Sequence, residues 1–351
     1  PIIKELQDGG TTFATRQKLA AKVFAKTGEY DAAIGRWFAN QDGAGLRYGE
    51  NPHQTAGFYP DSKIFGFGGA KVLPGGKELS YNNWLDLDGA VAAVNDLPSP
   101  AAVVVKHTNP CGAAIDNNSM QMAIAKAWDG DPLSAFGSVV AVNGHFDKES
   151  AKFLSGPNKF VEVLAAKSFD SEAISLLREG PKWGKNLRIV EVSDIGSARN
   201  QLEARRIWGG TLVQASDEAS AYSETLNIAG KIELNSDLEK DVRLAQTIVK
   251  HLKSNAICLV KNGQLVGAGA GQMSRVDSAE IAIKKAGERG EGSVAGSDAF
   301  FPFSDAVLAL ANAGVSVVVQ PGGSMRDNEV TEACNANNIC MIHTGTRHFK
   351  H

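Results

Sequence analysis

The chain has 351 residues, a formal net charge of −3 and four cysteines. Its length predicts about two domains, each large enough to bury a core. The charges are spread along the chain without a basic block, which argues against a nucleic acid or an anionic membrane as partner. No apolar stretch approaches the roughly 20 residues needed to cross a bilayer, and the first residues do not resemble a targeting peptide.

The spacing of the cysteines indicates reduced thiols in the cytoplasm. None of them belongs to a Cys-x-x-Cys pair, and no secretory segment precedes them. A disulfide framework and a zinc site are therefore both disfavoured. The four residues are Cys111, Cys258, Cys334 and Cys340.

The first 45 residues have a helical pattern. Apolar side chains recur at helical spacing between residues 15 and 40, with an interruption near Thr27-Gly28. The pattern predicts two helices, which would form a helical lead-in over residues 1–45. The residues that carry it are Leu19, Val23, Ile34, Trp37 and Phe38.

Residues 46–200 alternate between short apolar runs and helical patterns, which indicates an α/β domain. A polar stretch from Asp217 to Asn235 lacks periodicity, so a connecting segment is expected over residues 201–240. The strands expected in the first domain are 101–105, 138–142, 161–165 and 187–192, and the helices are 85–97 and 120–128.

The last part of the chain, residues 241–351, predicts a second α/β domain, which a helix at 237–252 leads into. Asn262-Gly263 separates two alternating runs, 256–260 and 264–268, and is a strong signal for a β-hairpin. Helices are expected at 278–286 and 306–313, and further strands at 315–319 and 340–343. Two similar α/β units are thus predicted, although the sequence holds no repeat identity that proves a duplication.

Lys106 and His107 form the strongest candidate for catalysis. They follow the apolar run 101–105, at a point where Asn109-Pro110 indicates a turn, and ligands bind beyond the carboxyl ends of strands in open α/β sheets. Histidine exchanges protons near neutrality, and a neighbouring lysine can stabilise negative charge or act as an acid. The alternative is a solvent-facing lysine beside a hydrogen-bonded loop histidine.

A glycine-rich segment runs from Gly267 to Arg275. It lacks the third glycine and the acidic residue of a dinucleotide fingerprint, and it also lacks the Gly-Lys-Ser/Thr of a phosphate-binding loop. One interpretation is that the glycines let the backbone approach a ligand, with Arg275 gripping a phosphate or carboxylate. The other is a plain turn at a strand end.

Four further segments combine aromatic, charged and turn-forming residues. Residues 46–54 suit the recognition of anions and rings but also fit an ordinary loop. Residues 297–305 could stack a flat heterocycle, or form a hydrophobic corner with a helix cap at Ser304 or Asp305. Residues 320–324 present backbone amides or a tight turn, and residues 346–351 form either a site wall or a solvated basic tail.

Eight ordered segments between Leu46 and His351 resemble the transformylase part of a family of bifunctional purine enzymes, which formylate 5-aminoimidazole-4-carboxamide ribonucleotide (AICAR). The resemblance implies transfer of a formyl group from the cosubstrate 10-formyltetrahydrofolate to the AICAR amine. It also implies two cytidine-deaminase-like three-layer α/β domains, joined by a helical segment, without the deaminase zinc. The segments are LRYGENPHQ, GKELSYNN, KHTNPCG, DPLSAFG, GAGAGQMSR, SDAFFPFSD, QPGGS and RHFKH.

The resemblance assigns roles to individual positions. His107 would accept a proton from the amine, and Lys106 would stabilise the tetrahedral intermediate or protonate the departing folate nitrogen. Phe349 and His351 would be walls of the site. The positions implied for AICAR are Arg47, Tyr48, Gly137, Glu162, Asn255, Arg275, Phe300 and Arg347, and those near the folate are Val276, Asp305, Ser324 and Met325.

Further expectations follow from the same resemblance. The partners would be the two substrates and a second copy of the chain, in a homodimer with active sites at its interface. A structural potassium ion is compatible with the family, and no zinc is expected. The chain begins within what resembles the final helices of a cyclohydrolase domain, so we expect it to lack cyclohydrolase activity. At Glu162 some relatives have Asp.

Two other classes of function stay open. The Pro110-Cys111 pair would fit a zinc hydrolase of the deaminase type, although neither His-x-Glu nor Pro-Cys-x-x-Cys accompanies Cys111. A non-catalytic fragment that binds AICAR is the other alternative, because the chain starts without Met. In the preferred reading, Cys111 is a small packing residue.

Overall fold

The computed structural model describes residues 2–42, 44–60, 64–197, 202–222 and 225–351, without the side chains of residues 29 and 32–42. The chain forms two compact units, residues 1–61 and 62–351. The first unit consists of α1 (Ile2–Gln7), α2 (Phe13–Asp42) and an antiparallel pair, β1 (Ala44–Leu46) and β2 (Ala56–Phe58).

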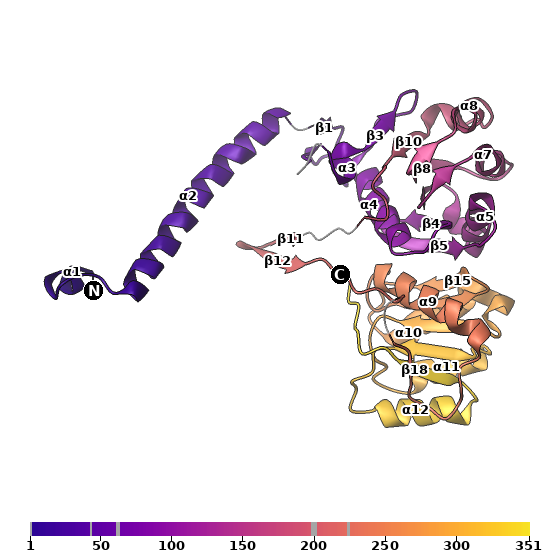
Figure 1. The fold of residues 1–351 in the computed structure, drawn as a ribbon. Coiled ribbons are helices and arrows are strands. Elements are labelled where there is room, and N and C mark those ends of the chain that lie inside the picture. Colours follow the sequence, from indigo (N-terminus) through magenta and orange to yellow (C-terminus); the bar gives the residue numbers. More distant parts are fainter. Residues whose placement is uncertain (1, 43, 61–63, 198–201, 223–224) are drawn as a thin grey trace. The chain divides into compact units, whose positions relative to one another are not determined.

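Helix α2 corrects one prediction. The expected break near Thr27-Gly28 is wrong, because α2 continues through both residues (Figure 1). The Thr27 hydroxyl donates to the carbonyl of Val23, one turn earlier, at 3.1 Å, a hydrogen bond that a threonine within a helix can make. A single glycine costs a helix only about 1 kcal/mol relative to alanine. The side chains of Ile34, Trp37 and Phe38 lie outside the described residues.

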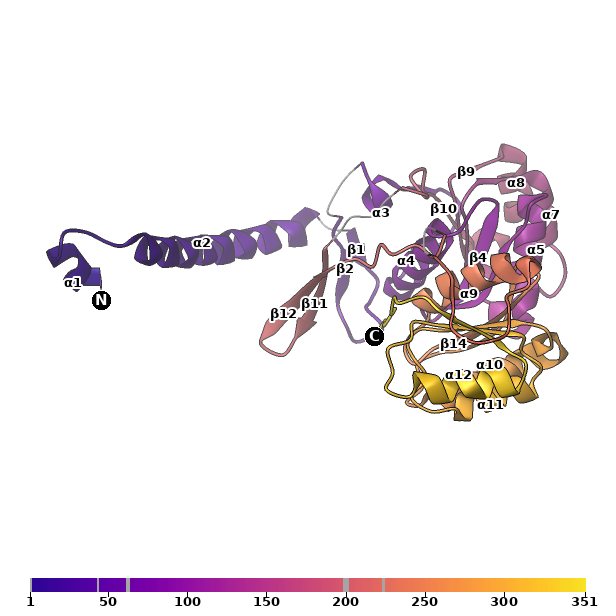
Figure 2. The same cartoon turned by 60° about the horizontal axis from the view of Figure 1, so that its bottom comes forward.

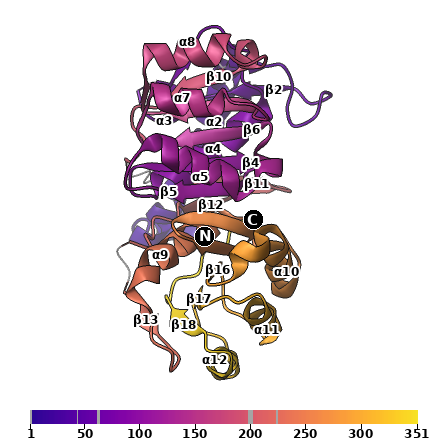
Figure 3. The ribbon, with the colours of Figure 1, turned by 90° about the vertical axis from the view of Figure 1, so that its right-hand side faces the viewer.

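The second unit contains a 12-stranded mixed sheet between two layers of helices, which confirms the predicted three-layer α/β fold. Its strand order is β13-β18-β17-β16-β14-β15-β5-β4-β6-β8-β10-β3. Strands β5 and β15 meet at the centre in an antiparallel pair, so the sheet is continuous across the unit (Figure 3). Among the described residues, no helix has both the length and the apolar character needed to cross a membrane.

Alternating side chains on the strands build the layers. In β4 (Ala101–Lys106), Ala101, Val103 and Val105 pack under α4 (Tyr81–Asn95), whereas Ala102 and Val104 face the opposite core. Helices α4 and α9 (Glu239–His251) share one continuous core on the first face of the sheet. The other face is covered by α5, α7 and α8 in the first half and by α10, α11 and α12 in the second (Figures 1 and 2).

The two halves of the sheet have the same succession of elements. The first half contains α4, β4, β5 (Asn109–Ile115), α5 (Met120–Gly130), β6 (Ser138–Val142), α7 (Lys148–Leu154), β8 (Val161–Ala166), α8 (Ser171–Glu179) and β10 (Arg188–Glu191). The second contains α9, β14 (Ile257–Lys261), β15 (Gln264–Gly269), α10 (Arg275–Ala286), β16 (Val294–Ser297), α11 (Asp305–Asn312), β17 (Val317–Gln320), α12 (Asp327–Ala336) and β18 (Cys340–His343).

The pairing pattern repeats as well. In each half, the first strand pairs antiparallel with its two neighbours, and the outer strands then run parallel. Antiparallel strands β3 (Lys71–Leu73) and β13 (Asn227–Ile228) close the two ends. The sheet therefore consists of two topologically equivalent halves, a duplication that the sequence alone did not establish.

Local details agree with an offset of 155 residues between the halves (262 minus 107). The register shifts at Val104/Val105 in the first hairpin and at Leu259/Val260 in the second. A side chain at Gly112 would collide with the carbonyl of a residue in α5, and one at Gly267 would collide with the carbonyl at the equivalent position of α10. Both glycines therefore allow a helix to pack closely on its strand.

The structure corrects the expected turn at Asn109-Pro110. The turn lies at His107-Thr108, and Asn109 and Pro110 already belong to β5. Proline lacks the N–H that a regular ladder requires, but the register shift between Val104 and Val105 places Pro110 at a β-bulge, where proline is tolerated.

Several shorter elements complete the unit. The helical ones are α3 (Gly66–Gly69), α6 (Pro132–Ala135), η1 (Gly184–Asn186), η2 (Ser236–Leu238) and η3 (Gly287–Gly290). Strands β7 (His145–Phe146) and β9 (Ser168–Phe169) form a small parallel pair. Strands β11 (Leu202–Ile207) and β12 (Gly210–Ala215) form a hairpin within the segment that was expected to connect two domains. The predicted domain boundaries stay predictions.

Candidate functional site

The Lys106-His107 pair lies at the tip of the β4–β5 hairpin. Lys106 ends β4, and His107 and Thr108 form a two-residue turn before β5. Both turn residues have positive φ angles, 51° and 62°, a conformation that suits the twist of a hairpin. It is uncommon for residues other than glycine and especially unfavourable for a β-branched residue such as Thr108. His107 is exposed and Lys106 is half-buried, so both can reach a ligand outside the sheet.

Lys106 contacts the segment that connects α6 to β6. Its Nζ donates to the carbonyl of Phe136 at 2.7 Å. Gly137 has a φ of 74°, and a Cβ placed there would lie 3.6 Å from the same Nζ. The predicted residues Lys106 and Gly137 are therefore neighbours. The Asp131 side chain caps α6 and so helps to order the segment that leads to Gly137.

Two carboxylates lie near the turn. Glu162, on β8, accepts a hydrogen bond from Asn83 Nδ2 at 3.1 Å and lies 3.7 Å from Arg188 Nη1. Asp86, on α4, accepts the backbone N–H of Thr108 at 2.6 Å. Partial burial raises the pKa of the Asp86 carboxyl, although the Thr108 hydrogen bond opposes that shift. Sequence reasoning missed Asp86, whose place in the middle of an amphipathic helix carries no catalytic signal.

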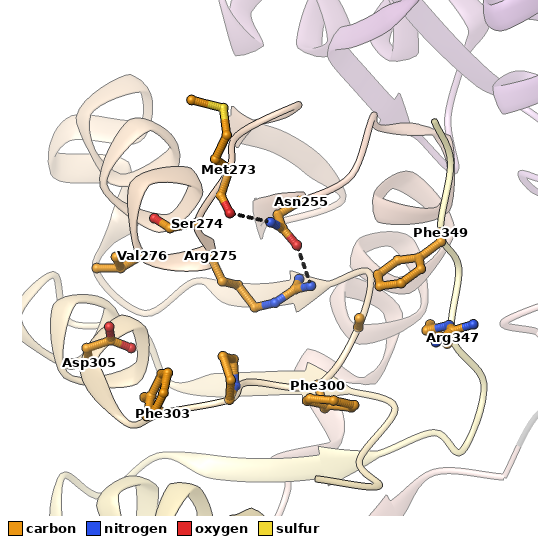
Figure 4. Close-up of a pocket in the computed structure, with 12 residues that line it drawn as sticks. Asn255, Met273, Ser274, Arg275, Val276, Phe300, Phe303, Asp305, Arg347 and Phe349 are labelled. Carbon is orange, nitrogen blue, oxygen red and sulfur yellow. Dashed lines mark hydrogen bonds between the residues drawn. The ribbon is translucent and has the colours of Figure 1, made fainter.

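A cavity of about 510 Å³ lies in the second half of the sheet. It gathers seven of the predicted site residues from four separate segments of the chain. Its size falls within the range of small-molecule pockets. Figure 4 shows the lining residues, which are Asn255, Met273, Ser274, Arg275, Val276, Ala299, Phe300, Pro302, Phe303, Asp305, Arg347 and Phe349.

Arg275 is less available than the sequence suggested. It is buried, and its Nη1 forms an ion pair with the fully buried Asp298 and donates to Ser297 Oγ at 3.0 Å. Its Nη2 donates to Asn255 Oδ1 at 2.8 Å, while Asn255 Nδ2 donates to the carbonyl of Met273 at 3.1 Å (Figure 4). Arg275 therefore fixes the orientation of the Asn255 amide in the cavity wall.

The aromatic segment 300–303 divides between cavity and core. Phe300 and Phe303 line the cavity, whereas Phe301 is fully buried beneath them. The side chain of Gln320, at the end of β17, accepts the N–H of Phe301 at 2.8 Å and so holds the segment in place. Asp305 begins α11 and is exposed at the cavity edge, as a donor-binding carboxylate would need to be.

The carboxyl-terminal segment is anchored. His348 is buried and contacts Asp217 Oδ2 at 2.7 Å, and its backbone N–H donates to the carbonyl of Asp298. The guanidinium of Arg347 lies 4.4 Å from the ring centre of Phe349. Because Arg347 is exposed at the cavity while Arg275 is paired, Arg347 is the better placed of the two to bind an anionic group.

Some predicted residues lie elsewhere. Ser324 and Met325 follow β17 and are not among the residues lining this cavity, and Ser324 N–H donates to Asp327 Oδ2 at 3.1 Å. His351 lines a second cavity, which it shares with Phe349. In the first unit, Arg47 Nη2 donates to the hydroxyl of Tyr48 at 2.9 Å.

One side chain links the hairpin to the cavity wall. Asn109 Nδ2 donates to the carbonyl of His107 at 3.0 Å, and Asn109 Oδ1 accepts the backbone N–H of Lys253 at 2.9 Å. Lys253 precedes Asn255 by two residues, and Asn255 bonds to Arg275. Hydrogen bonds and the backbone of residues 253–255 thus connect the turn to the polar wall of the cavity.

The glycine-rich segment has two roles. Gly267 and Gly269 lie in β15, where side chains would collide with the backbone of α10, so the interpretation that these glycines admit a ligand is wrong for both. The part that follows, Met273 to Arg275, lines the cavity. Helix packing and ligand contact are therefore divided between the two ends of the segment.

Cys111 is partly buried and packs against the core under α5. Burial raises the pKa of its thiol to about 12, which opposes formation of the thiolate that binds metals. In the described part of the chain, no three His, Cys, Asp or Glu side chains are grouped so as to hold a metal ion.

Fold and site together define a duplicated three-layer α/β protein, with a strained His107-Thr108 turn in one half and a small-molecule cavity in the other. The family model described as "AICARFT/IMPCHase bienzyme" matches residues 1–285. The chain belongs to this family, whose members act in purine biosynthesis.

Three relatives illustrate the match, each named "Bifunctional purine biosynthesis protein PurH". The protein of Rhodopirellula baltica is 45% identical over 98% of this chain and 68% of its own length. Those of Desulfitobacterium hafniense and Bacillus cereus are both 41% identical, over 98% and 100% of this chain respectively. The chain spans 70% of the length of each of these two relatives.

Proposed function

We propose that the chain transfers the formyl group of 10-formyltetrahydrofolate to the 5-amino group of AICAR. The observation that carries this proposal is the Lys106-His107 pair beside a turn that Asn109 ties to Lys253, two residues before Asn255 in the wall of a cavity rich in predicted substrate residues. Membership of the family supports the substrates.

The chemistry explains why such a pair is needed. The AICAR amine is conjugated with an electron-poor ring and is a weak nucleophile, so its attack on the formyl carbon needs a positioned base. His107 takes the amine proton as the new C–N bond forms. Lys106 stabilises the oxyanion of the tetrahedral intermediate, and then protonates the folate nitrogen as the old C–N bond breaks. The products are formyl-AICAR and tetrahydrofolate.

Different cavity residues would bind different groups of the two substrates. Arg347 suits the ribose phosphate, and the Asn255 amide, oriented by Arg275, suits the carboxamide or amine of AICAR. Phe300 offers a ring for stacking, while Asp305 could accept hydrogen bonds from the pterin edge of the folate. Arg47, Tyr48, Gly137, Glu162, Val276, Ser324, Met325 and His351 stay predicted site residues.

A homodimer belongs to the same proposal. The β11–β12 hairpin exposes several apolar side chains, which a partner subunit could cover: Leu202, Trp208, Leu212 and Val213. Light scattering of the purified chain tests this part of the proposal. A monomer that is fully active would contradict it.

The activity itself is tested by a steady-state assay with AICAR and 10-formyltetrahydrofolate. Release of tetrahydrofolate that depends on AICAR is the expected result. Calorimetric titration with AICAR alone separates the alternatives. Binding without turnover, in a folded preparation of the expected oligomeric state, would favour a non-catalytic role, and neither binding nor turnover would contradict the proposal altogether.

A further inference from the structure

The His107-Thr108 turn has a counterpart in the second half of the sheet. The counterpart is Asn262-Gly263, which joins β14 to β15 with φ angles of 55° and 73°. Asn-Gly is the preferred pair for such a turn, because both residues adopt positive φ at low cost. His-Thr is a poor pair by the same criterion, and the β-branched threonine is the more strained member. Something in the surroundings must hold the first turn in shape.

A carboxylate from the preceding helix contacts each turn. In the second half, Asp241 accepts the N–H groups of Asn262 and Gly263 at 2.7 and 2.6 Å. In the first half, Asp86 accepts the N–H of Thr108 at 2.6 Å and also a backbone hydrogen bond from His107. Both aspartates precede their turns by the same number of residues. In both halves, an aspartate on the preceding helix thus fixes a left-handed turn by accepting its backbone N–H groups.

The first turn has a second support, which contacts the segment leading to Asn255. Asn109 binds the carbonyl of His107 and the N–H of Lys253. At the equivalent position of the second half, Gln264 instead donates from Nε2 to the carbonyl of Lys126 at 2.8 Å. Asn109 therefore links the His107-Thr108 turn to the 253–255 segment, whereas Gln264 contacts Lys126.

We propose that Asp86 and Asn109 are positioning residues, which together hold the backbone of His107 in its left-handed conformation and in fixed relation to the cavity wall. Asp86 supports the amide side of the turn, and Asn109 ties its carbonyl side to the segment that leads to Asn255. This inference rests on the proposed role of His107. A displacement of about 1 Å at a catalytic group lowers a rate up to about 100-fold, so both residues matter for turnover although neither lines the cavity.

The test compares Asp86→Ala, Asp86→Asn and Asn109→Ala in the full chain, with rates expressed per folded protein. Asp86→Ala and Asn109→Ala are expected to lower kcat by about 10- to 100-fold, with KM for AICAR changed less than about threefold. Asp86→Asn keeps an oxygen that can accept the turn N–H, so its kcat should stay within about threefold of wild type.

Asp241→Ala is the matched control. It removes the same support from a turn without a catalytic residue, and it should reduce stability while kcat per folded protein stays unchanged; Asp241→Asn replaces it if the alanine variant does not fold. A wild-type chain without turnover would overturn the proposed function. Wild-type kcat in Asp86→Ala and Asn109→Ala, with His107→Ala inactive, would overturn this inference alone. An Asp86→Asn variant as slow as Asp86→Ala would also overturn it, since charge and not geometry would then be needed.

Discussion

The two hairpin turns of the sheet occupy equivalent positions and are built from different residues. Asn262-Gly263 is the pair that the backbone geometry favours, and neither residue has a side chain that exchanges protons near neutral pH. His107-Thr108 adopts the same left-handed geometry, which the β-branched Thr108 strongly disfavours. The first turn therefore keeps a conformational cost at the position of the proposed proton acceptor, His107, and the hydrogen bonds of Asp86 and Asn109 compensate for that cost.

The largest effect is expected when the first turn is given the residues of the second. The double variant His107→Asn, Thr108→Gly places the favoured pair in the first hairpin. Activity should fall by about 10²- to 10⁴-fold, the usual loss for a general base. The free energy of unfolding should rise by about 1 kcal/mol, because left-handed strain is relieved. Steady-state kinetics and urea denaturation measure the two effects, and a variant that loses stability would show that the turn is unstrained.

The ends of helices α4 and α9 are joined by a cluster of charged residues. Asp96, after α4, contacts His251 Nε2 at 2.8 Å and Lys250 Nζ at 2.9 Å, both at the end of α9. Lys250 and His251 are buried, so Asp96→Ala leaves the Lys250 ammonium group, which also donates to the carbonyl of Ala219, without its carboxylate. We expect a loss of about 2 to 3 kcal/mol in urea denaturation, somewhat below the range for fully buried pairs. A loss below about 0.5 kcal/mol would mean that solvent replaces the carboxylate.

The same cluster predicts how stability depends on pH. Burial lowers the pKa of His251 to about 4 from 6.5, against the opposing effect of Asp96. Between these values the unfolded chain binds a proton that the folded chain does not, so stability is complete above pH 6.5 and falls as the pH drops towards 4. His251→Gln should flatten this dependence in denaturation curves at a series of pH values. An unchanged slope would assign the dependence to other groups.

Asp96 acts in a lower pH window. Burial alone would raise its pKa, but the His251 and Lys250 contacts outweigh burial and lower the pKa to about 2. Its contribution to stability is therefore present above its ordinary pKa of 3.8 and is lost as the pH falls towards 2. Acid unfolding of the wild-type chain should show this second step, and Asp96→Asn should remove it.

The smallest expected effect is in the second turn. Gly263→Thr imposes on it the residue type of the first turn, at a φ of 73° and with the new Cβ 3.0 Å from the carbonyl oxygen of Ile115. Stability should fall by about 1 to 2 kcal/mol in urea, and kcat per folded protein should not change. A loss of activity equal to the loss in the first-turn exchange would show that the two turns are not functionally distinct.

Much of the fold could be predicted from the sequence, because apolar runs and turn signals are local. Strands 138–142 and 340–343 have the expected bounds, and the hairpin around Asn262-Gly263 is confirmed. Strand β5 was missed because Asn109-Pro110 indicates a turn unless a bulge accommodates the proline. The duplication was hidden because it is preserved in strand order and backbone contacts and not in residue identity.

Several residues of the candidate site could be predicted from the sequence, but the contacts between them could not. Family resemblance selected seven residues that line one cavity, yet it could not reveal that Arg275 is paired with the buried Asp298. Asp86 and Asn109 carry no signal as single residues, because their roles depend on contacts with distant backbone groups. Such contacts appear only once the sheet has brought the segments together.

Proton transfer by His107, presented on a costly turn, is the proposed basis of the activity. Its most direct test is the kcat of His107→Ala beside that of Asn262→Ala, each per folded protein and with AICAR binding measured by calorimetry. We expect a loss of about 10²- to 10⁴-fold for His107→Ala with AICAR binding retained, and no change for Asn262→Ala. A His107→Ala chain that turns over within about threefold of the wild-type rate would contradict it.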